Sequence, residues 1–289
     1  MRAAPDVGHS PAISQEDPMR SILLHVHDDA GLSARLAAAL DLARRFDGHV
    51  TCLQPIAFEY AVPGDFYGTA VVELMTVMQE VADRVREATE ARLAGEDVRW
   101  DWIDERGLDS SRLLEYAALS DVVVIGAVPP PGETRGPSRL AGTLAIHGRT
   151  PLLVVPPDQP RLSVGGPALV AWNGSPESSR ALRAALPLLG EASEVYLARV
   201  AEPGRGDGFD MPPLRGAEYL ARHGIECELV ELPVLPEGVA HTLEEAARAR
   251  RAELLVSGAY GHSRMIETIF GGVTRRMLTA PSLPLLLAH

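Results

Sequence analysis

The feature that most constrains this chain is an internal repeat with an offset of about 132 to 146 residues. Apolar stretches at 22–26 and 169–172 are each followed by a polar turn and by a segment rich in Ala, Leu and Arg. Further along, 121–126 corresponds to 253–258, and each half closes on an apolar stretch that follows a proline. A chain of 289 residues fits two domains of roughly 120–140 residues each. The sequence therefore predicts two copies of one domain in tandem.

Within each half, apolar stretches with the length of strands alternate with helical segments. Continuous apolar strands separated by helices are typical of a parallel sheet that is covered on both faces. We therefore expect an α/β fold with two tandem open parallel five-stranded sheets and helices on both faces. The expected strands lie near 21–27, 49–54, 98–103, 121–127, 151–156, 168–172, 194–200, 226–232, 253–258 and 283–288. The expected helices lie near 31–46, 69–94, 109–119, 139–148, 176–189, 213–223, 239–250 and 271–280.

The repeat also predicts the domain boundaries. We expect a flexible tail at 1–19, a first domain at 20–160 that ends in a short proline-stiffened linker at 156–160, and a second domain at 161–289. The closing strand of each domain has an edge that needs cover, and pairing these two strands would supply it. We therefore expect an intramolecular pseudo-dimer of the two domains, with a homodimer of whole chains as a further state.

Composition excludes several functional classes. The chain contains no lysine, and all 27 basic residues are arginine, so a lysine-containing phosphate loop and Schiff-base chemistry are excluded. A net charge of −12 makes nucleic acid and anionic membranes unfavourable partners. No apolar stretch approaches the ~18 residues of a membrane span, and 1–19 lack the apolar core of a signal peptide. We expect a cytoplasmic protein whose two cysteines, Cys52 and Cys227, are buried reduced thiols.

The clearest binding motif follows the fourth strand of the second half. Its glycines are Gly258, Gly261, Gly271 and Gly272, in the spacing G-x2-G-x9-G followed by a small residue. We expect positive φ at the first two glycines, which lets the backbone turn and approach a ligand without obstruction by a Cβ. The last two begin a helix, whose free N–H groups favour a phosphate without a lysine. The alternative is that the glycines only shape a turn and a helix start.

Other side chains near this motif could contribute to binding. The helix start would present the N–H groups of Gly272, Val273 and Thr274. Hydroxyl groups could come from Ser263 and Thr274, and a positive charge from His262. The sequence thus offers a set of donors for an anionic ligand.

The motif resembles the G-x2-G-x9-G-[S/T] signature of nucleotide-binding universal stress proteins, and the resemblance extends over nearly the whole chain. It implies the strand order 3-2-1-4-5 and ATP, accompanied by Mg²⁺, as the ligand. The adenine would meet the backbone near Ala171 and Trp172 and near Val200, while the Trp172 ring could either stack on the base or lie in the core. Two positions depart from the family: Gly272 replaces its last Ser or Thr, and Asn173 replaces its acidic residue after the first strand.

The first half has lost the motif. Gly126 is followed closely by Pro129, Pro130 and Pro131, which have no N–H to offer a phosphate. Residues 1–162 hold 15 arginines against 24 acidic residues, whereas 163–289 hold 12 against 15. We therefore expect one nucleotide per chain, in the second domain. His25 and His27 lie two apart at the first turn, but no third metal ligand is evident, so we expect no metal site.

The sequence contains no recognisable catalytic set. The resemblance implies a stress-response regulatory module that binds an adenine nucleotide and is not an enzyme, with weak ATP hydrolysis left open. One alternative is a universal stress protein that binds no nucleotide and acts as a protein–protein interaction module. Another is an ATP hydrolase or nucleotidyl transferase, against which the missing catalytic residues argue.

Overall fold

The structure is a computed structural model, and it describes residues 19–56, 69–127, 138–201, 213–259, 272–279 and 281–289. Its described residues form strands close to every range that the sequence predicts. The strands are β1 (Ser21–His25), β2 (His49–Ile56), β3 (Arg99–Arg106), β4 (Val122–Gly126), β5 (Leu152–Val155), β6 (Ala168–Ala171), β7 (Val195–Ala201), β8 (Glu228–Pro233), β9 (Leu254–Gly258) and β10 (Leu285–Ala288). The helices are α1 (Leu32–Phe46), α2 (Thr69–Leu93), α3 (Asp109–Ala117), α4 (Arg139–His147), α5 (Pro176–Ala184), α6 (Leu186–Glu191), α7 (Pro213–Arg222), α8 (Val239–Ala249) and α9 (Gly272–Thr279).

One prediction of helix extent is wrong. The expected helix at 176–189 is divided into α5 and α6, with Ala185 between them. Pro187 lies in the first turn of α6, where its missing N–H and fixed φ are tolerated. The continuous Ala and Leu pattern concealed this break, because proline at the start of a new helix does not interrupt apolar periodicity.

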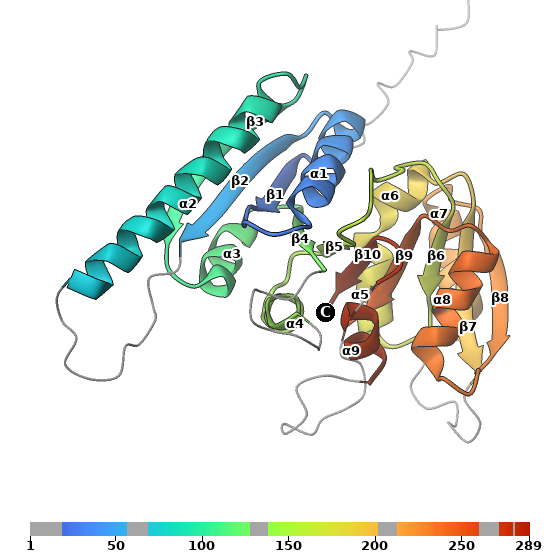
Figure 1. Cartoon of the computed structure of the whole chain (residues 1–289). Coiled ribbons are helices and arrows are strands. Elements are labelled where there is room, and N and C mark those ends of the chain that lie inside the picture. The colour runs from blue at the N-terminus through green and yellow to red at the C-terminus, as the bar shows by residue number, and fades with distance from the viewer. Residues whose placement is uncertain (1–18, 57–68, 128–137, 202–212, 260–271, 280) are drawn as a thin grey trace, which may run out of the picture.

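The strands form one ten-stranded sheet in the order β3-β2-β1-β4-β5-β10-β9-β6-β7-β8. Each half therefore has the expected order 3-2-1-4-5, with parallel neighbours throughout, and the predicted fold class is confirmed. The closing strands β5 and β10 pair antiparallel, with Leu153 opposite Leu286, as the sequence predicts. Figure 1 shows this junction between the blue-to-green first half and the yellow-to-red second half.

Helices cover both faces of the sheet, and each face has one apolar core that continues across the two halves. Helices α1, α5, α6 and α7 contribute to one core, and α3, α4, α8 and α9 to the other. Because side chains alternate along a strand, Leu24 of β1 packs in the first core and Leu23 in the second. Burial on both faces is the reason that the central strands read as unbroken apolar stretches.

The two cysteines differ in their surroundings. Cys52 on β2 is fully buried, and burial, with a smaller effect of Asp101 and Glu90, raises its pKa to about 12. Cys227 is only partly buried, so the prediction of a buried thiol is correct for Cys52 and wrong for Cys227. No helix among the described residues is both long enough and apolar enough to cross a membrane.

Candidate functional site

The candidate site lies at the carboxyl edge of the second half, between β6 and β9. These two strands are neighbours, and β6 pairs with β7 on its other side. After β6 the chain enters α5 on one face of the sheet, whereas the helix that follows β9, α9, packs on the other face. The connections therefore diverge at this point, which is where ligands bind in open parallel sheets.

The turn after β6 is held by its own side chains. Asn173 is exposed, and its Oδ1 accepts a hydrogen bond from the backbone N–H of Ser175 at 3.1 Å. Gly174 has a φ of 77°, and the Ser175 hydroxyl caps α5 by accepting from the N–H of Ser178. The exposed side chain of this turn is thus the neutral Asn173, and the turn residues 173–175 include no acidic side chain.

The Trp172 side chain belongs to the core. It is 3% exposed, and a Cβ added to Gly216 of α7 would lie 3.1 Å from its ring. Its indole Nε1 is buried and makes no hydrogen bond to any residue that the structure describes. Stacking on a base would require the ring to leave this packing, so the structure favours the core alternative. The backbone N–H of Trp172 donates to the carbonyl oxygen of Ala198 at 2.8 Å.

Gly258 serves close packing in this structure. A positive φ was expected there, and this prediction is wrong, because Gly258 is absent from the described glycines that have one. A Cβ on Gly258 would lie 2.6 Å from the backbone C of Glu177 and the backbone N of Ser178. The first glycine of the signature therefore allows the start of α5 to approach β9.

Among the described residues, nothing covers the start of α9. Gly272 is exposed, and a Cβ added to it would meet no described residue within 4 Å. Val273 is half-buried and Thr274 is buried, so the hydroxyl of Thr274 lies on the inner side of the helix. Ala171 and Val200 are both half-buried near the ends of the neighbouring strands β6 and β7. The predicted site residues Gly261, His262, Ser263 and Gly271 lie outside the described residues.

The corresponding edge of the first half contains a buried arginine that sequence reasoning did not single out. Arg35 of α1 is fully buried, and it donates to the carbonyl oxygens of His25 (2.7 Å) and His27 (2.9 Å) and to Oδ1 of Asp29 (2.6 Å). A Cβ on Gly126 would lie 2.9 Å from Nη1 of this guanidinium. The Arg35 guanidinium therefore lies against the carboxyl end of β4. The fourth residue of α5, which has the position of Arg35 in α1, is the small Ser179.

Asp29 makes the same turn contact in the first half that Asn173 makes in the second, although the turn of the first half is longer and strand register matches Asn173 to His27. Its Oδ1 accepts from the N–H of Gly31 at 2.7 Å, just as Asn173 accepts from Ser175. Burial alone would raise the pKa of Asp29, but the hydrogen bond and the charge of Arg35 outweigh burial and lower it. The Asp29 carboxylate therefore already has hydrogen-bond partners within the protein, Gly31 and Arg35.

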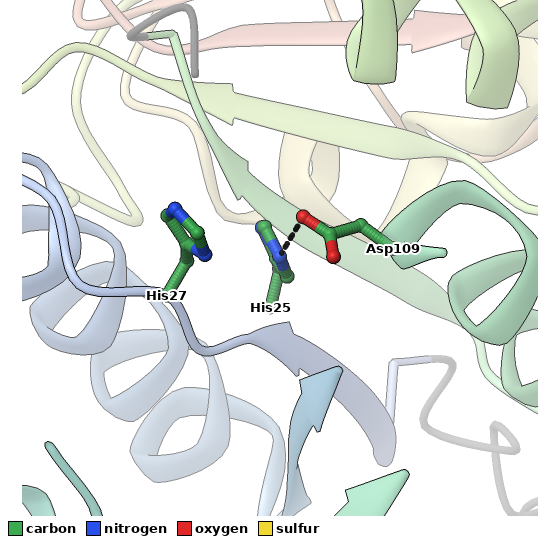
Figure 2. Close-up of side chains that lie close together, drawn as sticks. All are labelled: His25, His27 and Asp109. Atoms are coloured by element: carbon green, nitrogen blue, oxygen red, sulfur yellow. Dashed lines mark ion pairs between the residues drawn. The ribbon is translucent and has the colours of Figure 1, made fainter. Parts of the chain in front are cut away.

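The structure also brings a third group to the two histidines. Nε2 of His25 lies 3.4 Å from Oδ2 of Asp109, the first residue of α3, and the His25 and His27 rings stack with centroids 5.8 Å apart (Figure 2). Burial, aided by the charges of Arg35 and His27, lowers the pKa of His25 against the opposing effect of Asp109. For Asp109, burial favours a higher pKa, but the interaction with His25 and the charges of both histidines lower it. Asp109 could not be singled out from the sequence, because contacts between strand ends and distant helix starts depend on topology.

Comparisons with known proteins agree with this architecture. The model of the universal stress protein family matches residues 166–289. A universal stress protein from Archaeoglobus fulgidus DSM 4304 has a similar structure, with a TM-score of 0.71 and 15% identity over 93% of this chain and 96% of that one. A candidate universal stress protein from Pseudomonas aeruginosa UCBPP-PA14 gives a TM-score of 0.56 and 16% identity over 94% of both chains. No curated protein matches the sequence. Residues 166–289 therefore match the universal stress protein family, and the whole chain has the fold of solved universal stress proteins.

Proposed function

We propose that the protein is a regulatory module of the stress response whose second half binds one adenine nucleotide, ATP with Mg²⁺. The observation that supports this most directly is the difference between the two carboxyl edges. In the second half the edge has an exposed helix start at Gly272, where an added Cβ would meet none of the residues that the structure describes. In the first half the same region holds the Arg35 guanidinium and its hydrogen bonds.

Charge supports the same assignment. A helix N-terminus carries a partial positive charge and unsatisfied N–H donors, which favour a phosphate. The start of α9 has no acidic residue in its first turn, and the exposed side chain after β6 is the neutral Asn173. The phosphates are therefore proposed to lie at α9, with the adenosine toward the ends of β6 and β7.

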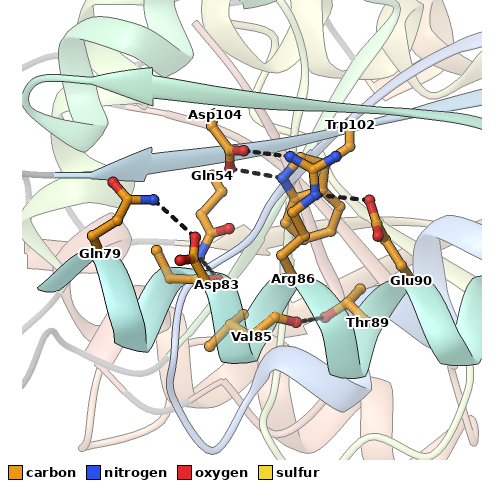
Figure 3. Close-up of polar contacts among 10 residues, drawn as sticks. Gln54, Gln79, Asp83, Val85, Arg86, Thr89, Glu90, Trp102 and Asp104 are labelled. Atoms are coloured by element: carbon orange, nitrogen blue, oxygen red, sulfur yellow. Dashed lines mark hydrogen bonds and ion pairs between the residues drawn. The ribbon is translucent and has the colours of Figure 1, made fainter. Parts of the chain in front are cut away.

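A second candidate function, a protein–protein interaction module, is favoured by α2. A polar network fixes this helix to the sheet: Arg86 lies 5.7 Å from the Trp102 ring centroid and donates to Asp104 at 2.7 Å (Figure 3). Near the start of α2, Leu74 and Val77 are 43% and 54% exposed. Exposed apolar side chains on a well-held helix suit a contact with another protein or a second chain. We propose this as an additional role, with no catalytic activity assigned to the site.

The nucleotide proposal can be tested with one residue of α9. Gly272→Asp places a carboxylate at the proposed phosphate position, and Gly272→Asn places a neutral side chain of the same shape there. Neither should disturb the fold, because the position is open, and an acidic residue suits a helix N-terminus. Calorimetric titration with MgATP should show at least tenfold weaker binding for Gly272→Asp than for Gly272→Asn.

Identification by mass of any nucleotide released from the denatured protein would complement the titration. Equal affinities of the two variants would contradict the placement of the phosphates. Absence of binding to the parent at millimolar MgATP would contradict the nucleotide proposal and leave the interaction module.

A further inference from the structure

We propose that His25, His27 and Asp109 of the first half form a binding site for a divalent transition-metal cation such as Zn²⁺. Each side chain offers one ligand atom, and the three atoms lie within 4.8 Å of one another. No other group of three such residues occurs among the residues that the structure describes. The site is separate from the proposed nucleotide site, which belongs to the other half of the chain.

The chemistry of the ligands fits this class of cation. Two imidazoles and one carboxylate are ligands that Zn²⁺ takes in proteins, and three protein ligands leave a fourth position for water. In a tetrahedral site with bonds near 2.0 Å, the ligand atoms would be about 3.3 Å apart. Nε2 of His25 and Oδ2 of Asp109 are already 3.4 Å apart. His27 and Asp109 are only partly buried, so their side chains can adjust to close the remaining distance.

Nε2 of His25 provides an independent observation. The His25 side chain is 5% exposed, yet Nε2 makes no well-formed hydrogen bond to a residue that the structure describes, although it faces Asp109. A buried polar atom without such a partner costs free energy. A cation bound by both Nε2 of His25 and the Asp109 carboxylate would give Nε2 the polar partner that it lacks.

The backbone around the histidines is held in place by a buried support. Arg35 donates to the carbonyl oxygens of His25 and His27, which fixes the orientation of the segment that carries both rings. Its positive charge would oppose a bound cation, but Nη1 is paired with Asp29 at 2.6 Å. Such outer contacts orient the ligands of metal sites. Arg35 is therefore a positioning residue in this proposal.

The second half supplies an internal comparison. By strand register, Ala171 and Asn173 correspond to His25 and His27, and Val239 begins α8 as Asp109 begins α3. The repeat thus places three metal-ligating residues at three equivalent positions of one half and none of that kind in the other half. A shared structural requirement of the fold does not account for them.

The test is a titration of the whole untagged chain, freed of metal, with Co²⁺, followed by competition with Zn²⁺. We expect one Co²⁺ per chain, with visible absorption bands of low-coordinate cobalt. His27→Ala and Asp109→Asn should each weaken binding at least about tenfold, because even the partners of metal ligands are worth 10–100-fold. His49→Ala is the matched control, because it removes a histidine that pairs with Asp101 at 2.7 Å on an exposed surface.

The variants are chosen so that folding does not decide the outcome. His27 and Asp109 are partly exposed, whereas His25 is buried and its replacement could disturb β1. Circular dichroism should show all three variants folded. The proposal is overturned if the parent binds no cobalt at equimolar metal, or if His27→Ala and Asp109→Asn bind it as tightly as His49→Ala.

Discussion

The packing of Gly258 yields a stability prediction that separates the structural and ligand-binding roles of the signature glycines. In Gly258→Ala, the new Cβ would lie 2.6 Å from backbone atoms of Glu177 and Ser178, whereas ordinary contacts begin near 3.4 Å. The first turn of α5 must therefore move by about 0.8 Å, since backbone atoms cannot rotate away as a side chain can. Overpacking typically costs about 1–3 kcal/mol, and we expect the upper part of that range here.

The measurement is the thermal unfolding midpoint, recorded by circular dichroism. For a unit of 150–250 residues, 1 kcal/mol corresponds to about 2–4 °C, so Gly258→Ala should lower the midpoint by about 5–10 °C. The control is Gly272→Ala, which changes another signature glycine where the Cβ meets open space. Alanine there should leave the midpoint unchanged or raise it slightly. Equal midpoints for the two variants would refute the packing role of Gly258.

Three further predictions follow from buried groups. At pH 8 a thiol reagent should modify Cys227 first, and Cys52 only after unfolding, because a pKa of about 12 keeps the buried thiol protonated until the pH approaches that value; equal rates in the folded protein would contradict this. Asp29→Asn should lower the free energy of unfolding by about 1.5–3 kcal/mol in urea titrations, because it removes the charged partner of Arg35; an unchanged value would show that the ion pair contributes nothing. Glu177→Gln should strengthen MgATP binding several-fold in calorimetry, because it removes a negative charge beside Gly258. Oε2 of Glu177 is buried there without a hydrogen bond to the described residues, and weaker binding of the variant would argue against the proposed edge.

The fold was predictable from the sequence because strand and helix signals repeat. The same order of apolar stretches occurs twice, so each half supported the interpretation of the other, and the prolines before 152–155 and 285–288 indicated the closing strands that pair. The division of the expected helix at Ala185 was not predicted, because the apolar periodicity continues through this residue.

The site was only partly predictable, because its properties depend on contacts between distant residues. The glycine spacing located the carboxyl edge, but the role of Gly258 depends on the approach of α5, which lies far from it in the sequence. Arg35 reads as an ordinary helix arginine, and its burial follows from carbonyl oxygens that only the folded turn presents. For the same reason, sequence alone did not bring Asp109 to His25 and His27.

The most direct test of the central claim is the stoichiometry of MgATP binding to the parent chain, measured by isothermal titration calorimetry. The account predicts one nucleotide per chain, because no described residue covers Gly272 at the edge of the second half, whereas Arg35 occupies the edge of the first. The Gly272→Asp variant should then bind MgATP at least tenfold more weakly than the parent. Two equivalent sites per chain, or one site that Gly272→Asp leaves unchanged, would contradict the account.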